Sequence, residues 1–139
     1  MREDVPGDPR KAPRLRVLIV DDDARVRRAL RGLIECAPDL TVVGEAGSTR
    51  GAGRLDLELG PDVVVLDLLL PQASEGMRVL RELRGRGRPV VAISRMGELG
   101  PQAVAAGAHA FLEKHGRDID DLPEMIRAAY RHDPWPRGG

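Results

Sequence analysis

The polar residues that could carry chemistry in this chain stand at the ends of short apolar runs; they are Asp21, Asp22, Asp23, Asp67, Ser94 and Lys114. The stretch PDVVVLDLLLP at 61–71 shows the pattern best, because Asp67 interrupts an otherwise apolar run. An apolar run of about four to eight residues between turn signals predicts a strand buried on both faces of a parallel sheet. A carboxylate in such a run needs an explanation. We therefore expect Asp67 at the carboxyl end of its strand, where open α/β sheets bind their ligands.

Carboxylates that gather in one place repel each other unless they share a proton or bind a cation. A ligand set made of oxygen atoms suits Mg²⁺, which keeps several waters and often bridges to a phosphate. Lysine offers a point charge for phosphate or carboxylate, and a serine hydroxyl offers a hydrogen bond. Together the aspartates, Ser94 and Lys114 suggest phosphoryl chemistry that depends on Mg²⁺.

Alternating strands and helices must position these residues. We expect strands at 16–20, 40–46, 62–67, 90–94 and 110–114, and helices at 24–36, 48–59, 76–85, 101–107 and 118–132. Short connections in this alternation predict a parallel sheet with helices on both faces. Right-handed crossovers favour a doubly wound α/β fold, for which the flavodoxin-like strand order 2-1-3-4-5 is one of the two common choices. Strands one and three then flank the switch point, so Asp21, Asp22 and Asp67 should converge in one crevice.

Composition narrows the class of protein. Lysine plus arginine (22) equals aspartate plus glutamate (22), so nothing favours direct binding of nucleic acid. Cys36 is the only cysteine, which allows neither a disulfide nor a cysteine-rich metal site. No membrane span or signal peptide is recognisable. We expect a cytoplasmic protein that does not bind membranes, with a flexible arm at 1–14, one domain at 15–131 and an irregular tail at 132–139.

Four motifs, in this order, resemble the receiver domain of bacterial two-component response regulators. They are VLIVDDD at 17–23, DVVVLDLLLP at 62–71, VVAIS at 90–94 and AGAHAFLEK at 106–114. The likeness covers about residues 15–131. In addition, VVGEAGS at 42–48 is similar to the branch of receivers usually joined to LuxR-type DNA-binding domains.

The resemblance implies that Asp67 is the phosphoacceptor, which attacks the phosphohistidine of a sensor histidine kinase or a small phosphodonor. It also implies a Mg²⁺ cofactor held at Asp67, directly by Asp22, mainly through water by Asp21, and by the backbone carbonyl of Leu69. Such an ion would neutralise charge on the transferring group.

The resemblance further implies a switch. Lys114 would pair first with Asp67 and then with the phosphoryl group, while Ser94 would swing in to hydrogen-bond a phosphoryl oxygen. Phe111 stands at the position of the aromatic switch residue, whose movement reshapes the surface around the fourth helix, fifth strand and fifth helix. Phosphorylation would bias a two-state equilibrium, and the output would be contact with an unidentified protein or a phosphorylation-dependent dimer, not catalysis on an external substrate.

Several positions depart from the family pattern. The loop PQASEGM carries one residue more than usual, and the stretch from Ser94 to Lys114 is shorter, which predicts a truncated or partly unwound fourth helix. Arg95 replaces the usual small residue, and its bulk could hinder an attacking water; our hypothesis is a slowly hydrolysing phosphoform. His115 follows Lys114 where relatives often have proline, and the isomer of that peptide bond stays open.

Other interpretations compete with these. The aspartates at 21–23 could simply cap the first helix, and arginines 78, 81, 84, 86 and 88 fit a solvated helix face better than a basic patch. We favour a single-domain regulator over the receiver half of a LuxR-type transcription factor, and leave a receiver that never accepts phosphate as a lesser alternative. An aspartate-nucleophile phosphatase is remote, because its second aspartate would stand at Leu69.

Overall fold

The structure is a computed structural model that describes residues 13–133. The expected arm at 1–14 and tail at 132–139 lie largely outside these residues. The elements in chain order are β1 (Leu15–Val20), α1 (Ala24–Glu35), β2 (Leu40–Ala46), α2 (Thr49–Leu59), β3 (Val63–Asp67), α3 (Ala73–Gly85), β4 (Val90–Ser94), α4 (Gly100–Ala105), β5 (Ala110–Glu113) and α5 (Leu122–Arg131). Two 3₁₀ helices, η1 (Gly97–Leu99) and η2 (Arg117–Asp121), precede α4 and α5. No helix in this part of the chain is long and apolar enough to cross a membrane.

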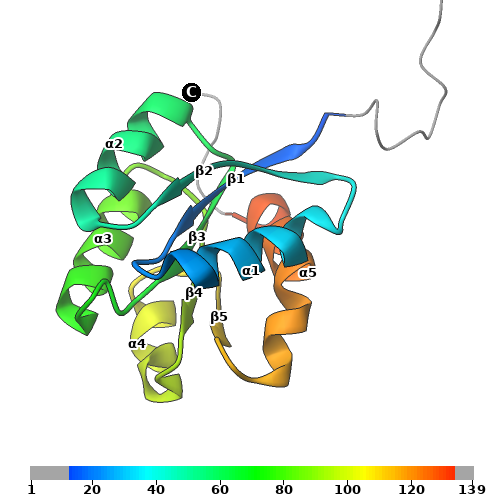
Figure 1. The fold of residues 1–139 in the computed structure, drawn as a ribbon. Coiled ribbons are helices and arrows are strands. Elements are labelled where there is room, and N and C mark those ends of the chain that lie inside the picture. The colour runs from blue at the N-terminus through cyan, green and yellow to red at the C-terminus, as the bar shows by residue number, and fades with distance from the viewer. Residues whose placement is uncertain (1–12, 134–139) are drawn as a thin grey trace, which may run out of the picture.

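The five strands form one parallel sheet in the order β2-β1-β3-β4-β5 (Figure 1). This confirms the predicted flavodoxin-like, doubly wound topology. Every residue of β3 and β4 is buried, as expected for central strands covered on both faces. Because all strands run in the same direction, their carboxyl ends meet at one edge of the sheet.

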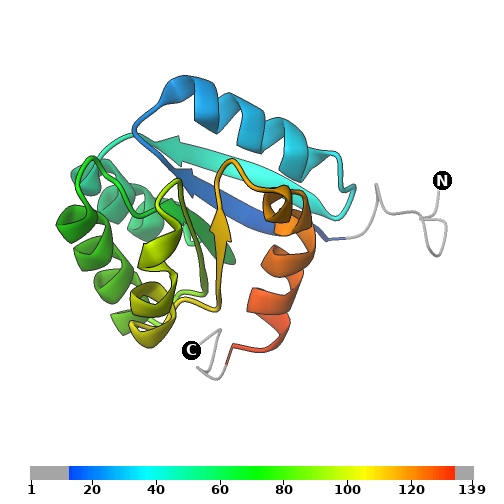
Figure 2. The same ribbon diagram turned by 90° about the horizontal axis from the view of Figure 1, so that it is seen from below.

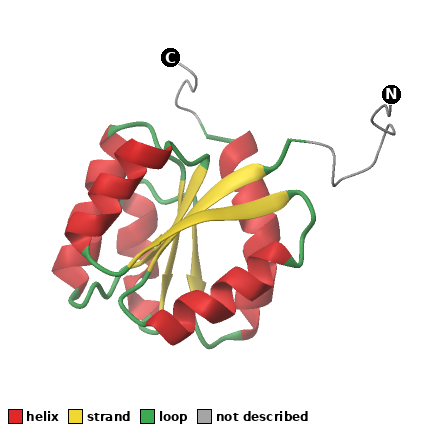
Figure 3. Cartoon of the chain, turned by 45° about the horizontal axis from the view of Figure 1, so that its top comes forward, coloured by secondary structure: helices red, strands yellow, loops and turns green. Residues whose placement is uncertain are grey.

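Helices cover both faces of the sheet and divide the core in two. In Figures 1 and 2, α1 and α5 lie on one face, and α2, α3 and α4 lie on the other. Figure 3 shows the same layers with the sheet between the helices. One apolar cluster joins the sheet to α2, α3 and α4, and a second joins it to α1 and α5. The apolar residues that recur at helical spacing in α3 and α5 are buried, namely Met77, Leu80, Leu83, Leu122, Ile126 and Ala129.

Two helices differ from the sequence prediction, and a third agrees with it. Helix α3 begins at Ala73, not near residue 76, so most of the supposed loop after Pro71 belongs to its first turn. The last helical segment is not one helix, because η2 gives way to α5 at Leu122, next to a proline in the first turn. Helix α4 has only six residues and follows a 3₁₀ turn, in agreement with the predicted shortening.

Glycine at position 76 is required by close packing of α3 against the end of β3. A Cβ added there would lie 1.9 Å from the carbonyl oxygen of Leu68, far inside any tolerable contact. The backbone of α3 can therefore approach the segment that follows Asp67 only because Gly76 has no side chain.

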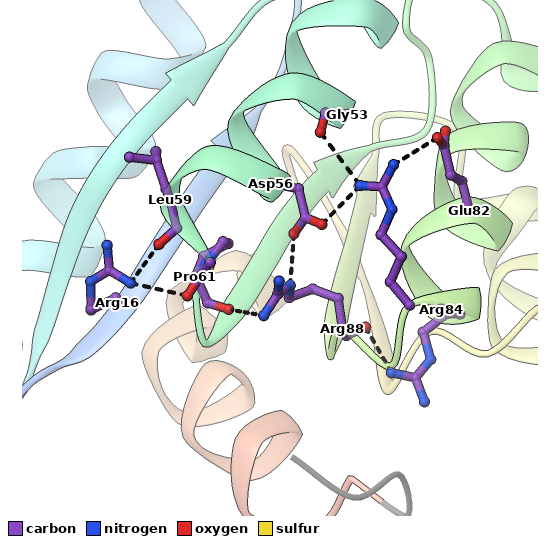
Figure 4. Close-up of polar contacts among 10 residues, drawn as sticks. Arg16, Gly53, Asp56, Leu59, Pro61, Glu82, Arg84 and Arg88 are labelled. Carbon is purple, nitrogen blue, oxygen red and sulfur yellow. Dashed lines mark hydrogen bonds and ion pairs between the residues drawn. The ribbon is translucent and has the colours of Figure 1, made fainter. Parts of the chain in front are cut away.

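A charged cluster lies at the edge of the sheet where β3 and β4 begin, opposite their carboxyl ends (Figure 4). The carboxylate of Asp56 in α2 is fully buried and lies 2.9 Å from Nη1 of Arg86 and 2.7 Å from Nε of Arg88. Arg88 also donates to the carbonyl of Pro61, and Arg84 donates to the carbonyl of Arg88. The interpretation of these three arginines as a solvated helix face is therefore wrong. Arg86 and Arg88 connect the end of α3 and the start of β4 to α2, and Arg84 binds the Arg88 carbonyl and Asp133.

Candidate functional site

Three predicted acidic residues meet at the carboxyl edge of the sheet. Asp21 and Asp22 follow β1 and Asp67 ends β3, and one carboxylate oxygen from each lies within 4.8 Å of the other two. They stand beside a hollow of about 570 Å³, which Asp22 and Asp67 line together with Lys114. The strand order places β1 next to β3, and this adjacency is what brings the acids together.

Lys114 connects the two buried acids. Its Nζ lies 2.9 Å from Oδ2 of Asp67 and 2.8 Å from Oδ2 of Asp21. The Lys114 side chain is 10% exposed, whereas Asp67 and Asp21 are 2% and 0% exposed. Lys114 follows β5, and its backbone N–H donates to the carbonyl of Ser94 at 2.9 Å, which continues the β4–β5 pairing and directs the lysine toward β3 and β1.

The pKa values of this pair follow from burial and charge. Burial raises the pKa of Asp67 above its ordinary 3.8, and it outweighs the opposing effect of the Lys114 hydrogen bond. Burial alone would lower the pKa of Lys114, but the hydrogen bonds and charges of Asp21 and Asp67 raise it overall. Lys114 therefore remains a cation at neutral pH.

Backbone amides hold the carboxylates in place. The N–H of Leu69 donates to Oδ1 of Asp67 at 3.0 Å, and the N–H of Asp23 donates to Oδ1 of Asp21 at 2.9 Å. Asp23 itself caps α1, since its Oδ1 accepts from the N–H of Arg25 at 2.9 Å. The capping interpretation is thus correct for Asp23 alone, whereas Asp21 and Asp22 belong to the acidic cluster with Asp67.

The donor set fits a magnesium ion. The carboxylates of Asp21, Asp22 and Asp67 offer only oxygen atoms, which Mg²⁺ prefers. Oδ2 of Asp21 is buried and lies 2.8 Å from the Lys114 ammonium, so this carboxylate is held in place beside a cation. Asp22 is exposed and can reach an ion that enters from solvent.

Ser94 and Phe111 lie nearby but outside this cluster. Ser94 ends β4 with its side chain fully buried, and its Oγ accepts from the backbone N–H of Met96 at 3.0 Å. Phe111 in β5 is half-buried against the α2–α4 side of the core. A Cβ added to Gly100 would lie 3.0 Å from the Phe111 ring, so the ring packs directly on the start of α4. Neither Ser94 nor Phe111 is among the described residues that line the hollow.

Two residues that depart from the family pattern stand at the rim. Arg95 and His115 are exposed and line the hollow. Within residues 13–133 the one cis peptide bond joins Leu70 and Pro71, so the bond between Lys114 and His115 is trans. The free cysteine, Cys36, is exposed at the end of α1.

One site contact had no signal in the sequence. Arg27 of α1 donates from Nη1 to the backbone carbonyl of Asp21 at 2.5 Å. The apolar spacing of residues 24–36 leaves Arg27 off the core-facing side of the helix and indicates no partner for it. Every residue has a backbone carbonyl, so no residue type in the sequence indicates which carbonyl will accept a side-chain hydrogen bond.

Comparison with known proteins identifies the family. The model of the response regulator receiver domain matches residues 17–127. The chain is 39% identical over 127 residues to protein-glutamate methylesterase/protein-glutamine glutaminase 1 of Dechloromonas aromatica, covering 82% of this chain and 36% of that protein. It is 36% identical over 117 residues to the uncharacterized transcriptional regulatory protein YvfU of Bacillus subtilis, covering 81% of this chain and 58% of that protein. The chain thus spans only part of the length of these relatives.

Solved structures give the same result. The response regulator domain of Thermotoga maritima CheB matches with a TM-score of 0.78 and 33% identity, over 87% of this chain and 99% of that chain. A LuxR-family response regulator from Aurantimonas sp. matches with a TM-score of 0.77 and 32% identity, over 85% of this chain and 86% of that chain. The likeness therefore extends to both CheB and LuxR-type receivers, and the chain belongs to the receiver domain family of two-component response regulators.

Proposed function

We propose that this chain accepts a phosphoryl group on Asp67 from a sensor histidine kinase and thereby switches a protein-interaction surface. Receiver domains as a family are phosphorylated on aspartate, bind Mg²⁺ and interact with sensor histidine kinases. The observation that carries the proposal for this chain is the Lys114 ammonium, which lies within 3 Å of both Asp67 and Asp21 beside an open hollow. A nucleophile, a fixed cation and a set of metal-binding oxygens are what phosphoryl transfer to a carboxylate needs.

This arrangement supports the following transfer step. An oxygen of the Asp67 carboxylate attacks phosphorus as the bond from phosphorus to the donor nitrogen breaks, and the electron pair leaves with the imidazole. The Leu69 N–H holds Oδ1 of Asp67 at 3.0 Å, which fixes the carboxylate plane during the attack. Lys114 keeps its proton and stays beside the new acyl phosphate as a counter-charge. A bound Mg²⁺, held by Asp21, Asp22, Asp67 and the Leu69 carbonyl, would supply charge neutralisation on the transferring oxygens.

The switch is proposed to run through Ser94 and Phe111. The Ser94 hydroxyl now accepts from the Met96 amide at 3.0 Å, and rotation toward Asp67 would let it donate to a phosphoryl oxygen instead. Loss of the Met96 hydrogen bond would loosen the segment that leads into η1 and α4. Phe111 packs on Gly100 at the start of α4, so a movement of this segment changes the space available to the ring. The resulting surface around α4, β5 and α5 is where an output protein, or a second copy of the chain, would bind.

We further propose a cytoplasmic protein without an external substrate, which acts as a single-domain regulator. Balanced charge and a lone cysteine support this setting. A second candidate is the receiver half of a LuxR-type transcription factor, favoured by YvfU, of which the chain covers 58%, and by the LuxR-family structure. The reading frame downstream of the codon for Gly139 separates the two: an immediate stop supports the first, and a helix-turn-helix coding segment supports the second.

Phosphorylation of the isolated chain tests the proposal. The purified protein is incubated with magnesium chloride and acetyl phosphate, and its intact mass is compared with that of Asp67→Asn and of Asp118→Asn. Asp118 is an exposed aspartate of η2 and serves as the matched control. We expect one phosphoryl group on the wild type and on Asp118→Asn, and none on Asp67→Asn. No mass gain on the wild type with acetyl phosphate or phosphoramidate, or an unchanged gain on Asp67→Asn, would overturn the proposal.

A further inference from the structure

The contact between Arg27 and the end of β1 has no part in the roles assigned above. The Arg27 side chain is 19% exposed and reaches back from the first turns of α1 under the acidic pair. Its Nη1 donates to the carbonyl of Asp21 at 2.5 Å, and its Nε donates to Oε1 of Glu45 in β2 at 3.1 Å. Arg27 thus joins the helix that follows the acids to the strand beside them.

The acceptor is the peptide group between the two metal-binding acids. The carbonyl of Asp21 belongs to the peptide that links Asp21 to Asp22, and a peptide group is planar. On the other side of Asp21, its N–H donates to the carbonyl of Ala46 at 3.0 Å. By binding this carbonyl, Arg27 fixes the direction in which the chain leaves β1. That direction determines the position of the Cα of Asp22, from which its exposed side chain extends.

Neighbouring residues are arranged to keep Arg27 in this place. Nε of Arg27 binds Oε1 of Glu45, while Arg31 pairs with the other oxygen, Oε2, at 3.1 Å, so Arg27 has its own acceptor on this carboxylate. A Cβ added to Gly47 would lie 3.1 Å from Nη1 of Arg27, so the absence of a side chain at Gly47 leaves room for the guanidinium. Because Glu45 balances its charge, Arg27 acts on the site mainly through its hydrogen bond.

We infer that Arg27 is a positioning residue for the magnesium site: it fixes the peptide plane between Asp21 and Asp22 and so sets the angle between their carboxylates. This inference rests on the proposed function, because it concerns the ion that phosphorylation requires. Groups that orient metal ligands without touching the metal commonly change affinity about 10-fold to 100-fold when removed. A hydrogen bond to the backbone should fall at the lower end of that range.

Magnesium binding, measured without phosphorylation, tests the inference. Isothermal titration with magnesium chloride is performed on the wild type, Arg27→Met, Arg27→Lys and Arg31→Gln, after treatment with EDTA and dialysis. Arg31→Gln is the matched control, since it removes the other pairing of Glu45 from the same helix and leaves the Asp21 carbonyl contact. We expect the Kd for magnesium to be about 10-fold higher in Arg27→Met than in the wild type. It should be partly restored in Arg27→Lys and should change by less than about twofold in Arg31→Gln.

A second readout separates positioning from chemistry. In the acetyl phosphate reaction, the magnesium concentration that gives half the maximal rate should rise for Arg27→Met, while the rate at saturating magnesium stays near that of the wild type. If Arg27→Met does not fold, as judged by far-ultraviolet circular dichroism, Gly47→Ala takes its place, because the added methyl crowds Nη1 of Arg27 and should weaken magnesium binding in the same direction.

The outcomes distinguish this inference from the proposed function. A wild type that binds no magnesium and accepts no phosphoryl group refutes the proposed function. A wild type that binds magnesium, beside an Arg27→Met variant with the same Kd, refutes the role of Arg27 alone. Equal losses in Arg27→Met and Arg31→Gln also refute it, because the effect would then come from the Glu45 ion pairs.

Discussion

Replacing Lys114 by methionine should destabilise the metal-free protein strongly. Lys114 is the cation shared by two carboxylates that are almost completely buried. Methionine has a similar length and no charge, so the substitution removes the ammonium with little change in volume. Asp67 and Asp21 would then face each other without a counter-charge.

The structure sets the size of the effect. Removing one partner of a buried ion pair typically costs about 3–5 kcal/mol, because the remaining charge is left unpaired in a poorly solvated place. Here the hollow beside Asp67 admits water, so we expect about 3 kcal/mol, which lowers the Tm of a domain of this size by roughly 10 °C. Magnesium should restore much of the loss, since a ligand present at about 100 times its Kd stabilises by about 2.7 kcal/mol.

The pH dependence of this deficit has a definite sign. An aspartate whose pKa is raised on folding binds more protons in the folded than in the unfolded state, so its charge costs stability above the ordinary value of 3.8. Without Lys114 the pKa of Asp67 should rise further. The stability deficit of Lys114→Met should therefore be largest at and above neutral pH and shrink as the pH falls toward 3.8.

Thermal and urea unfolding, followed by far-ultraviolet circular dichroism, measure these effects in EDTA and in excess magnesium chloride. Arg131→Met is the control: it removes an exposed pair with Glu124, at 3.5 Å, and should cost less than about 1 kcal/mol. A Lys114→Met variant as stable as the wild type in EDTA, or one that magnesium does not stabilise more than it stabilises the wild type, would refute the electrostatic account of the site.

Three further predictions concern other parts of the chain. Asp56→Asn should lower the free energy of unfolding by about 2–3 kcal/mol, measured by urea unfolding. This is below the range for fully buried pairs, because the arginine partners of Asp56 are about one quarter exposed. The control Glu58→Gln breaks an exposed pair in the same helix and should change the free energy of unfolding by less than about 0.5 kcal/mol. Arg95→Ala should speed loss of the phosphoryl group several-fold, since the arginine lines the hollow through which water would attack; an unchanged half-life, measured by intact mass, would remove this hypothesis. The side-chain hydrogen bond from Arg127 lowers the pKa of Asp39 below 3.8, so the stability that this hydrogen bond contributes is present above pH 3.8 and is lost as the pH falls below that value. In thermal unfolding from pH 7 to about 3.5, the Tm values of the wild type and Asp39→Asn should therefore converge. A constant difference in Tm would contradict this prediction.

The sequence was most informative where one residue type had to stand at the end of a buried strand. Asp67 and Lys114 could be placed because a charge beside an apolar run has few explanations, and strand alternation determined which ends would meet. The clustering of Asp21, Asp22, Asp67 and Lys114 was predicted in this way. Their roles in phosphoryl transfer remain predictions.

Features set by contacts between distant segments could not be predicted. Asp56 lies in a glycine-weakened amphipathic segment, and nothing local shows that two arginines about thirty residues later reach it. The start of α3 at Ala73 was missed because PQASEG has the composition of a loop, although Gly76 allows the helix to pack on the chain after Asp67. The rotamer of Ser94 depends on a hydrogen bond with one backbone amide, which no sequence pattern specifies.

The hydrogen bond from Arg27 to a main-chain carbonyl has a consequence for how such chains diverge. The carbonyl is present whatever residue occupies position 21, so no substitution there can remove the acceptor. Positions 27 and 21 should consequently show no correlated variation among homologues, whereas position 27 should vary together with position 45, whose side chain supplies the second acceptor. Methods that infer contacts from covariation would then place Arg27 beside β2 and overlook its link to the acidic pair.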